Sequence, residues 1–591
     1  MLKIFRYLSK SGWALLCVSV VFIVLSVWLD LSLPGYMADI TTLVQIEGSE
    51  LSEVWYEGFR MLGVALAGMG TMIVIGFLGS RVATNLAKDL RERLFNKVLD
   101  FSEAEINNFS VASLITRTTN DITQVQDVFV MAFQIMLRSP ILAGWAIFKI
   151  LDRGVEWSIA TMVAIGVMMV LILVLVIFAL PKFKKVQGLT DNLNRVTREH
   201  LTGIRVVKAY NAKDYEKEKF EDANDELMRT NLFVQRMMAM LWPVIGFIMQ
   251  TLPLAIYLIG AYLIDAAGWD VRIDLFSNMI VFSSYAMMVI MAFLMMSMMF
   301  VMLPRAIVSA KRINEVLDMP LSLEYPEDSG ATDSVNVNDK SGAIVFNNVS
   351  FKYPMAEDYV LEDINFSVNP GETVAFIGST GSGKSTIVNL IARNYDVTVG
   401  DVTIDGRDVR SFGKKELARK IGYAMQKAVL FSGTVLSNVA FGVNESDVDI
   451  DDVKDAVDAA QGKDFVEKMD GDYHGAITQG GTNVSGGQKQ RLGIARSIFK
   501  NPDIFIFDDS FSALDYKTDR KLRSTLRSKF KTVTTLIVAQ RVATIKNADK
   551  IIVMDEGKIV GMGSHDELLS NCNTYYEIAS SQLSKEELSN G

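Results

Sequence analysis

The sequence contains few of the residues that build disulfide-bonded or metal-centred proteins. Among its 591 residues there are only two cysteines, Cys17 and Cys572, and three histidines. Two isolated cysteines indicate neither a disulfide framework nor a cysteine-based metal site. The formal net charge is −9, whereas nucleic-acid-binding proteins present a basic face. The composition therefore excludes the usual secreted scaffolds and makes a nucleic-acid partner unexpected.

Charged residues are also missing from long stretches of the first 300 residues. Crossing the hydrocarbon layer of a membrane takes about 20 apolar residues. Five stretches of this length are free of charged side chains: Ser11–Leu29, Met61–Ser80, Trp157–Leu180, Met237–Ile264 and Leu275–Pro304. A sixth stretch, Val128–Phe148, is interrupted by Arg138. We count it as a span, because without it the number of crossings would be odd and would contradict the charges of the loops.

The connecting segments alternate in charge. The N-terminus carries Lys3, Arg6 and Lys10, whereas residues 31–59 contain acidic side chains and no Lys or Arg. The long connections before the third and fifth spans are again basic. Cytoplasmic segments carry an excess of Lys and Arg. We therefore expect a multi-pass protein of the cell membrane with both termini in the cytoplasm. We expect no cleavable signal peptide, because no small-residue cleavage site follows the first apolar run.

The two long cytoplasmic connections have a helical period. No proline occurs between Arg81 and Gln134, and Ser110 can cap a helix before Val111. We expect the membrane helices to continue into the cytoplasm and to turn there. The alternative is a pair of long irregular loops, which are uncommon in compact domains.

The last predicted span is rich in methionine. Flexible thioether side chains can repack around different apolar ligands, although they also serve as simple packing residues. No acidic residue lies within the charge-free spans, which weakens a proton-coupled mechanism. The methionines are Met287, Met288, Met291, Met295, Met296, Met298, Met299 and Met302.

Composition changes after residue 320. The stretch 321–343 combines Pro, Gly, Ser, Asp and Asn without periodicity, as linkers do. We therefore predict an all-α membrane domain over residues 1–320, a linker over 321–343, a mixed α/β domain over 344–581 and a C-terminal tail over 582–591.

A phosphate-binding loop opens the second domain. An apolar strand, Val374–Ile377, leads directly into the loop, and a helical pattern follows it. The glycines let backbone N–H groups approach phosphates, while the lysine reaches the terminal phosphates and the following hydroxyl ligates Mg²⁺. The loop, with both flanking elements as this motif requires, reads Gly378-Ser379-Thr380-Gly381-Ser382-Gly383-Lys384-Ser385-Thr386.

A second apolar strand, Ile504–Phe507, ends in Asp508 and Asp509. An acid in this position holds Mg²⁺ in P-loop proteins. An ordinary turn at the end of a strand is the alternative, but the P-loop requires such a partner.

Between these strands, Val484 precedes Ser485, Gly486, Gly487 and Gln488, which open a helical run. A Ser-Gly-Gly sequence at a helix N-terminus is a second anion site. With this motif the sequence resembles the ABC transporter family, of the exporter half-transporter type, over nearly the whole chain. The resemblance identifies the motif as the family signature.

The resemblance also assigns roles to other residues. Tyr353 matches the aromatic side chain that stacks on adenine, and Gln426 matches the glutamine that joins Ser385 and Asp508 around Mg²⁺. Phe109–Asp121 and Glu199–Tyr210 resemble the turns at which exporter helices contact the ATP-binding domain. ATP and Mg²⁺ are the implied cofactors. Because each ATP lies between one P-loop and the signature of the other subunit, a dimer in the lipid bilayer is implied.

Three positions depart from the family pattern. The residue after the magnesium aspartate is usually Glu but here is Asp509, one methylene shorter. The usual histidine of the last switch turn is Gln540, and an amide cannot take a proton as imidazole does. A glutamate usually found shortly before the signature is Gln479. Drift at tolerant positions is the alternative reading. We prefer the interpretation that this ATP site is specialised, because Asp509 and Gln540 would act on the same γ-phosphate.

These departures resemble heterodimeric bacterial exporters with one degenerate and one competent ATP site. The expected partner is a different half-transporter that carries the missing Glu and His. The expected substrate is a hydrophobic drug, lipid or peptide. Two alternatives remain, namely uptake of a metal chelate and an ATP-gated or regulatory membrane protein. Dye efflux in inverted vesicles distinguishes export from uptake. Conductance across a planar bilayer distinguishes a transporter from an ATP-gated channel.

Overall fold

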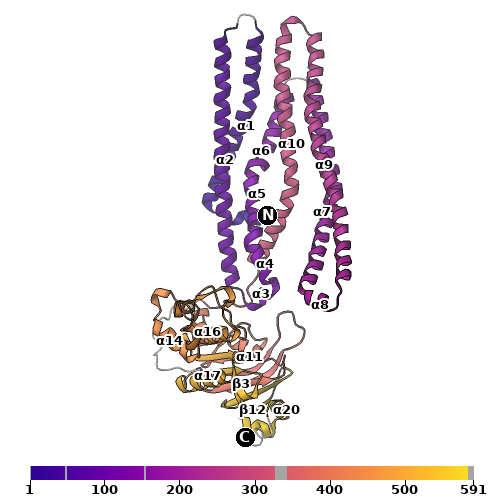
Figure 1. Ribbon diagram of the computed structural model, residues 1–591. Coiled ribbons are helices and arrows are strands. Elements are labelled where there is room, and N and C mark those ends of the chain that lie inside the picture. Colours follow the sequence, from indigo (N-terminus) through magenta and orange to yellow (C-terminus); the bar gives the residue numbers. More distant parts are fainter. Residues whose placement is uncertain (1, 47–48, 152–154, 327–341, 584–591) are drawn as a thin grey trace. The chain divides into compact units, whose positions relative to one another are not determined.

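The computed structural model describes residues 2–46, 49–151, 155–326 and 342–583 (Figure 1). The chain divides into two compact units. The first comprises Met1–Val98 and Ala112–Met319, and the second comprises Leu99–Val111 and Pro320–Gly591.

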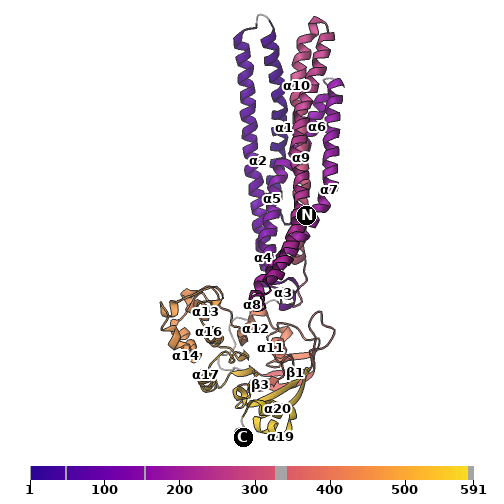
Figure 2. The ribbon, with the colours of Figure 1, turned by 45° about the vertical axis from the view of Figure 1, so that its right-hand side comes forward.

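The first unit consists of long helices (Figures 1 and 2). A short 3₁₀-helix, η1 (Leu2–Tyr7), precedes them. The third long helix is built from consecutive segments, two of them π-helical, η2 and η3. The remaining helical elements are α1 (Lys10–Gln45), α2 (Leu51–Leu99), α4 (Val111–Thr116), η2 (Arg117–Asp121), α5 (Ile122–Met131), η3 (Ala132–Met136), α6 (Arg138–Leu151), α7 (Val155–Thr202), α8 (Ile204–Ala209), α9 (Lys213–Ala266) and α10 (Trp269–Leu317).

These helices continue well beyond the expected spans, as the helical period of the long connections predicts, whereas the cytoplasmic location of the extensions stays a prediction. Helices α2, α7 and α9 contain 49, 48 and 54 residues, far more than the roughly 20 needed to cross a bilayer. Within the described residues, five helices are long and apolar enough to cross a membrane. The remaining expected span, Trp157–Leu180, lies on α7, where the described apolar run covers Val155–Leu171. That sixth crossing stays a prediction.

An apolar core joins α1, α6, α7, α9 and α10. Trp157 of α7 is buried against Phe282 of α10, with ring centroids 5.6 Å apart. The hydroxyl of Tyr285 donates to the carbonyl of Leu31 at 2.9 Å, so that α10 is also bonded to α1. Val289, Ile290 and other buried residues of α10 complete this core.

Polar contacts bind η2 to the last turns of α10. Buried Asp121 accepts a hydrogen bond from Ser309 at 2.9 Å, and Arg117 pairs with Glu315 at 2.9 Å. The π-helical segment η2 is thus bonded to α10 by buried polar groups. Such segments often occur at functional positions of a helix.

The described residues of the second unit form three sheets. The six-stranded sheet has the order β12-β11-β3-β10-β9-β6, in which β11, β3, β10, β9 and β6 are parallel and β12 is antiparallel. The four-stranded sheet, β2-β1-β4-β5, is antiparallel, and β7 pairs with β8. The strands are β1 (Ile344–Phe351), β2 (Leu361–Val368), β3 (Thr373–Gly378), β4 (Val399–Ile404), β5 (Arg407–Asp408), β6 (Ile421–Ala424), β7 (Gly433–Thr434), β8 (Ala476–Ile477), β9 (Ile504–Asp508), β10 (Thr534–Val538), β11 (Lys550–Asp555) and β12 (Lys558–Gly563).

Helices complete this α/β unit. The α-helices are α3 (Glu103–Phe109), α11 (Lys384–Ile391), α12 (Lys414–Lys420), α13 (Val435–Val439), α14 (Ile450–Ala459), α15 (Lys463–Val466), α16 (Gly486–Phe499), α17 (Tyr516–Lys529), α18 (Val542–Ile545), α19 (His565–Asn571) and α20 (Asn573–Gln582). The 3₁₀-helices are η4 (Val409–Ser411), η5 (Glu445–Asp447), η6 (Asp472–His474) and η7 (Gln479–Gly481).

The six-stranded sheet separates two apolar cores. Successive side chains of a strand point to opposite faces, and β3 follows this rule. Val374 and Phe376 belong to the core shared with β1, β2 and α11, whereas Ala375 and Ile377 belong to the core shared with α14, α16 and α17. Both faces are therefore covered, as in other parallel sheets.

Helix α3 and the start of the linker are bonded together within the second unit. The carboxylate of buried Glu105 accepts from the N–H groups of Ser102 at 2.6 Å and Ser322 at 2.9 Å. Burial opposes its ionisation, but these hydrogen bonds from Ser102 and Ser322 lower the pKa of Glu105 below its ordinary value of 4.5. The composition of residues 99–111 gives no sign that this segment belongs with the second unit, although the family resemblance predicted a contact with the ATP-binding domain beginning at Phe109.

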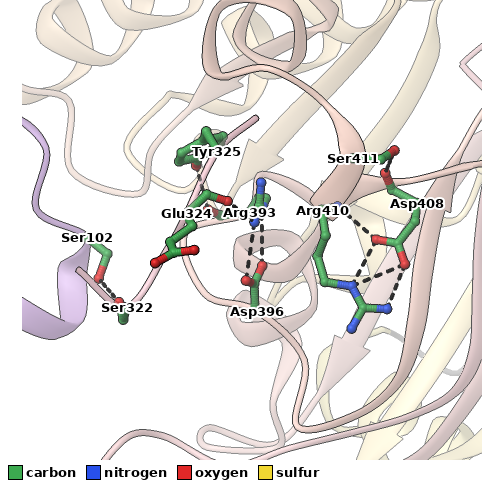
Figure 3. Close-up of polar contacts among 9 residues, drawn as sticks. All are labelled: Ser102, Ser322, Glu324, Tyr325, Arg393, Asp396, Asp408, Arg410 and Ser411. Atoms are coloured by element: carbon green, nitrogen blue, oxygen red, sulfur yellow. Dashed lines mark hydrogen bonds and ion pairs between the residues drawn. The ribbon is translucent and has the colours of Figure 1, made fainter. Parts of the chain in front are cut away.

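Arg393 holds the next residues of the linker (Figure 3). Its guanidinium donates to the carbonyl of Glu324 at 2.9 Å, pairs with Asp396 and covers the ring of Tyr325 at 4.4 Å. Residues 327–341, which include most of the predicted linker, lie outside the described part of the chain. Most of the predicted tail, 584–591, does so as well.

Candidate functional site: a nucleotide site at the edge of the sheet

The predicted motifs lie at the carboxyl ends of neighbouring parallel strands. The P-loop follows β3, Gln540 follows β10, Asp508 ends β9, and Gln426 follows β6. Because β10 lies between β3 and β9, the sheet order places the Gln540 turn between the P-loop and the Asp508–Asp509 pair. Ligands of open α/β sheets bind at this edge.

The glycines of the P-loop have conformations that side chains would block. Gly378, Gly381 and Gly383 have φ values of 155°, 87° and 95°. A Cβ atom on Gly378 would lie 2.0 Å from the carbonyl oxygen of Met554, and one on Gly383 would lie 2.5 Å from Leu361. The loop is thus a cradle of backbone N–H groups at the start of α11, which is the arrangement that binds phosphates.

Lys384 lies across this cradle. Its ammonium donates to the carbonyls of Ser379 at 2.6 Å and Gly378 at 3.1 Å and to the hydroxyl of Ser382 at 3.2 Å. Burial lowers the pKa of Lys384 below 10.5, although Asp508 and Asp509 oppose that change. The loop therefore positions a desolvated cation where phosphate oxygens would replace its own carbonyls.

Ser385 and Asp508 are joined directly. The Ser385 hydroxyl donates to the Asp508 carboxylate at 2.9 Å. Burial raises the pKa of Asp508 above 3.8, against the lowering effect of that hydrogen bond. A hydroxyl and a carboxylate are the hard oxygen ligands that Mg²⁺ takes beside substrate phosphates. These two residues therefore fit the predicted metal position, whereas the third predicted ligand, Gln426, contacts the next residue, Asp509.

The Asp509 carboxylate is held by two amides. Its Oδ2 atom accepts from Nε2 of Gln540 at 3.0 Å and from Nε2 of Gln426 at 3.2 Å. Asp509 has a φ of 46°, and its N–H donates to the carbonyl of Val538 at 2.9 Å. A cavity of about 100 Å³ beside this group is lined by Asp509, Phe511, Ser512, Val538, Ala539, Gln540, Arg541 and Thr544.

Tyr353 is tied to the P-loop helix. Its hydroxyl makes a hydrogen bond of 3.0 Å with that of Thr386, and its ring meets the edges of Phe351 and Tyr395. The predicted adenine-stacking residue is thus placed next to α11.

The signature segment begins α16 as predicted. Ser485 caps this helix by a reciprocal pair of bonds with Gln488, of 3.4 and 2.8 Å. Gly486 has open space around its Cβ position, and a Cβ on Gly487 would lie 3.1 Å from the carbonyl of Ala513. Across the described residues, the signature makes no hydrogen bond with the P-loop, Asp508 or Asp509. The structure therefore brings the P-loop, Asp508 and Asp509 together, but it does not place the signature beside them.

Sequence reasoning missed the side chains behind the Gln540 turn. Gln582 of α20 donates to the Gln540 carbonyl at 2.9 Å and accepts from the Val542 N–H at 2.8 Å. Arg523 of α17 donates to the Thr544 carbonyl at 2.7 Å and pairs with Asp519. Long-range backbone contacts of this kind leave no pattern in the sequence.

Sequence reasoning also missed the partner of Arg138. Its guanidinium forms an ion pair with Asp30 of α1, and both side chains are largely buried. A charge within a predicted span usually pairs with another charge. That rule predicts an acidic partner for Arg138, but it does not say that the partner is Asp30.

These observations define the class of the protein. A P-loop, an acid-ended neighbouring strand and a cradle suited to a nucleoside triphosphate with Mg²⁺ form a nucleotide-binding unit. In the same chain, a helical unit carries apolar helices long enough to cross a membrane. The molecule is thus a membrane protein with a nucleotide-binding domain.

The comparisons with known proteins identify the family. The family model for the ABC transporter transmembrane region matches residues 16–293, and that for the ABC transporter matches residues 361–512. An uncharacterized ABC transporter ATP-binding protein of Mycobacterium tuberculosis is 38% identical over 529 residues, which are 89% of this chain and 88% of that protein. The chain therefore belongs to the ABC transporter family, and its single copy of each domain is a half-transporter layout.

Other relatives place the chain among proteins of the exporter type. An ATP-dependent lipid A-core flippase of Pseudomonas fluorescens is 32% identical, with 87% of this chain and 83% of the flippase covered. The solved structure of a bacterial Atm1-family ABC exporter with ATP bound has a TM-score of 0.76 at 22% identity. The match covers 97% of this chain and 99% of that chain. At that identity the likeness describes the fold alone.

Proposed function

We propose that this chain is one subunit of a heterodimeric ATP-driven exporter in the cell membrane, and that its own P-loop builds the slow ATP site. The observation that carries the proposal is the Asp509 carboxylate, of which one oxygen accepts hydrogen bonds from both Gln540 and Gln426. A carboxylate engaged in this way is a weaker base for an attacking water, because the two donated hydrogen bonds stabilise its ionised form.

In contrast to the hydrolytic residues, the residues that would bind ATP and Mg²⁺ are all present. Lys384 and the loop N–H groups would bind the terminal phosphates, and Ser385, Asp508 and Gln426 would hold Mg²⁺. When bound, the metal ion neutralises charge on the phosphates. Tyr353 would pack against the adenine. The chain's own residues thus bind and orient ATP without a well-placed base or a histidine at the γ-phosphate.

The signature supplies the second part of the proposal. Ser485, Gly486 and Gly487 open α16 with an exposed cap and an uncrowded Gly486. In a head-to-tail dimer they would complete the partner's ATP site, because they retain the Ser-Gly-Gly of the family signature. The partner would carry Glu and His at the positions of Asp509 and Gln540, and an altered signature.

Export of hydrophobic or amphipathic compounds, such as drugs, lipids or peptides, is the direction that the relatives support. The methionine-rich helix α10 offers an adaptable apolar surface for such ligands. Both termini would be cytoplasmic, according to the loop charges. ATP-dependent accumulation of a hydrophobic dye inside inverted vesicles tests this direction, and ATP-dependent loss of the dye from them would contradict it.

The slow site is tested by asking which nucleotide each subunit retains. The purified dimer is trapped during turnover with a photoreactive ATP analogue, cross-linked and separated into its subunits. We expect this chain to carry mainly triphosphate and its partner mainly diphosphate. Equal diphosphate on both chains, or brisk turnover by a dimer of identical chains that depends on Asp509, would contradict the proposal.

A further inference from the structure

A second, larger cavity lies elsewhere in the ATP-binding unit. Its volume is about 640 Å³, and it is lined by the starts of β3 and β10 at Thr373 and Thr535, by α17 and by the segment Ala543–Asp549. The P-loop follows the opposite end of β3. The cavity therefore begins at the far edge of the sheet from the nucleotide site and extends along β10 to Ala543 and Thr544, and no motif of the sequence falls within it.

The charged side chains around this cavity are predominantly cationic. Its only acidic lining residue is Asp549, although the whole chain has a net charge of −9. Like charges gathered around one hollow repel each other unless an anion balances them, and low-dielectric walls strengthen their field. The cationic lining residues are Arg520, Arg523, Arg527, Lys531 and Lys546.

Most of this positive charge is not neutralised within the chain. Asp549 already accepts from the Thr373 N–H at 2.9 Å and lies 3.4 Å from the Arg527 guanidinium. Among the residues that the structure describes, no acidic side chain pairs with Arg520, Lys531 or Lys546. Of the five cations, Arg523 is paired with Asp519 at 2.8 Å and Arg527 with Asp549 at 3.4 Å, which leaves three without an acidic partner among the described residues.

We propose that this cavity binds a phosphate-bearing anion no larger than a nucleotide. Its volume falls within the range of about 300–1,000 Å³ that is usual for small-molecule sites. Guanidinium and ammonium groups are the side chains that bind phosphate most strongly. The exposed ring of Tyr516 and the partly buried ring of Phe530 offer apolar surface beside the charges.

The position of Arg523 connects this site to the nucleotide site. Its guanidinium donates to the carbonyls of Thr544 at 2.7 Å and Ala543 at 3.3 Å, in the helix that follows the Gln540 turn. Thr544 lines both this cavity and the smaller one beside Asp509. An anion that attracts Arg523 competes with these carbonyls, so its binding changes the stability of the Gln540 turn.

Binding is tested with inorganic pyrophosphate and the full chain, purified with any partner it has. Lys384→Ala first removes phosphate binding at this chain's P-loop, and the same change of the P-loop lysine in any partner removes it there. Arg520, Arg527 and Lys546 are all exposed, so their combined replacement by Ala should leave the fold intact. Isothermal titration should show one pyrophosphate site per chain that is at least tenfold weaker in the triple variant. The matched control is Lys517→Ala, a lysine of the same helix α17 that does not line the cavity.

Equal pyrophosphate affinity in the triple variant and the Lys517→Ala control would overturn the proposal, as would the absence of any binding in the Lys384→Ala chain. ATP binding by the triple variant with Lys384 intact shows that it is folded. Hydrogen exchange over residues 538–546 provides the second readout. Pyrophosphate should change exchange there in the control and leave it unchanged in the triple variant. Unchanged exchange in both would overturn the connection to the Gln540 turn. None of these outcomes depends on whether the nucleotide site itself is slow.

Discussion

On one side of the nucleotide site, the P-loop, Lys384 and the Ser385–Asp508 pair form a cradle that has every group needed to bind a triphosphate. On the other side, after β9 and β10, lie a short carboxylate and an amide, Asp509 and Gln540, which in the proposed function act on the γ-phosphate. The backbone scaffold is the same on both sides, since all these residues follow strands of one sheet. In the proposed function, binding and hydrolysis therefore depend on separate side chains, so that this chain would retain the first while the second is weakened.

The largest expected effect is on the binding side. Lys384→Ala removes the cation that the loop holds by three hydrogen bonds. Because hydrogen bonds to charged groups contribute about 1.5–3 kcal/mol each, we expect ATP affinity to fall by about 100-fold. Fluorescent-ATP titration measures this loss. Lys415→Ala, on the exposed face of α12, is the control and should bind normally. Equal affinity of the two variants would contradict the assigned role of Lys384.

Restoring the hydrolytic side should have the next largest effect. The double variant Asp509→Glu, Gln540→His returns the longer carboxylate and a group able to take a proton. Since small displacements of reacting groups cost about 100-fold in rate, we expect hydrolysis of the ATP held by this chain to increase by about 10- to 100-fold, with unchanged ATP affinity. Single-turnover measurement of cross-linked nucleotide detects this gain. Unchanged hydrolysis with intact binding would place the cause of slow turnover elsewhere.

Tyr353 tests the base-binding part of the same side. Tyr353→Ala removes an aromatic surface, and stacking of a base on such a surface contributes about 1–3 kcal/mol. We expect about a tenfold loss of ATP affinity. Tyr353→Phe loses only the hydrogen bond to Thr386 and should remain within a few-fold of the original protein. If the two variants weaken ATP binding equally, the ring does not stack on adenine.

The smallest expected effect concerns Gln582, which contacts the Gln540 turn from behind. Gln582→Ala removes two hydrogen bonds to the backbone, each contributing about 0.5–1.5 kcal/mol. We expect faster hydrogen exchange at the Val542 N–H and unchanged ATP affinity. Ser581→Ala, one residue earlier on α20, removes a bond within its own helix and is the control. Reduced ATP affinity in Gln582→Ala would show that the two sides are not separable.

The parts that the sequence predicts are those with strong local patterns. The long apolar helices, the P-loop between a strand and a helix, and the capped start of α16 all follow from spacing and composition. The pairing of Ser385 with Asp508 also follows, because a P-loop and an acid-ended strand share one edge of the sheet.

The remainder depends on contacts between distant segments. Nothing near Asp509 indicates that Gln540 and Gln426 donate to the same oxygen, since this depends on the order β10-β9-β6. Asp30 has no local signal as the partner of Arg138, 108 residues away. Glu105 likewise joins α3 to Ser322 through a single buried carboxylate, and a hydropathy pattern carries no information about such a contact.

The central claim is that this chain binds ATP at its own P-loop and supports hydrolysis chiefly through its signature. ATPase turnover of the purified dimer tests it most directly, with Asp509→Ala and Ser485→Ala measured side by side at saturating ATP. We expect Asp509→Ala to retain most of the activity and Ser485→Ala to lose about 100-fold or more, as when a donor to the transferred group is removed. Loss of turnover in Asp509→Ala together with normal turnover in Ser485→Ala would contradict the account.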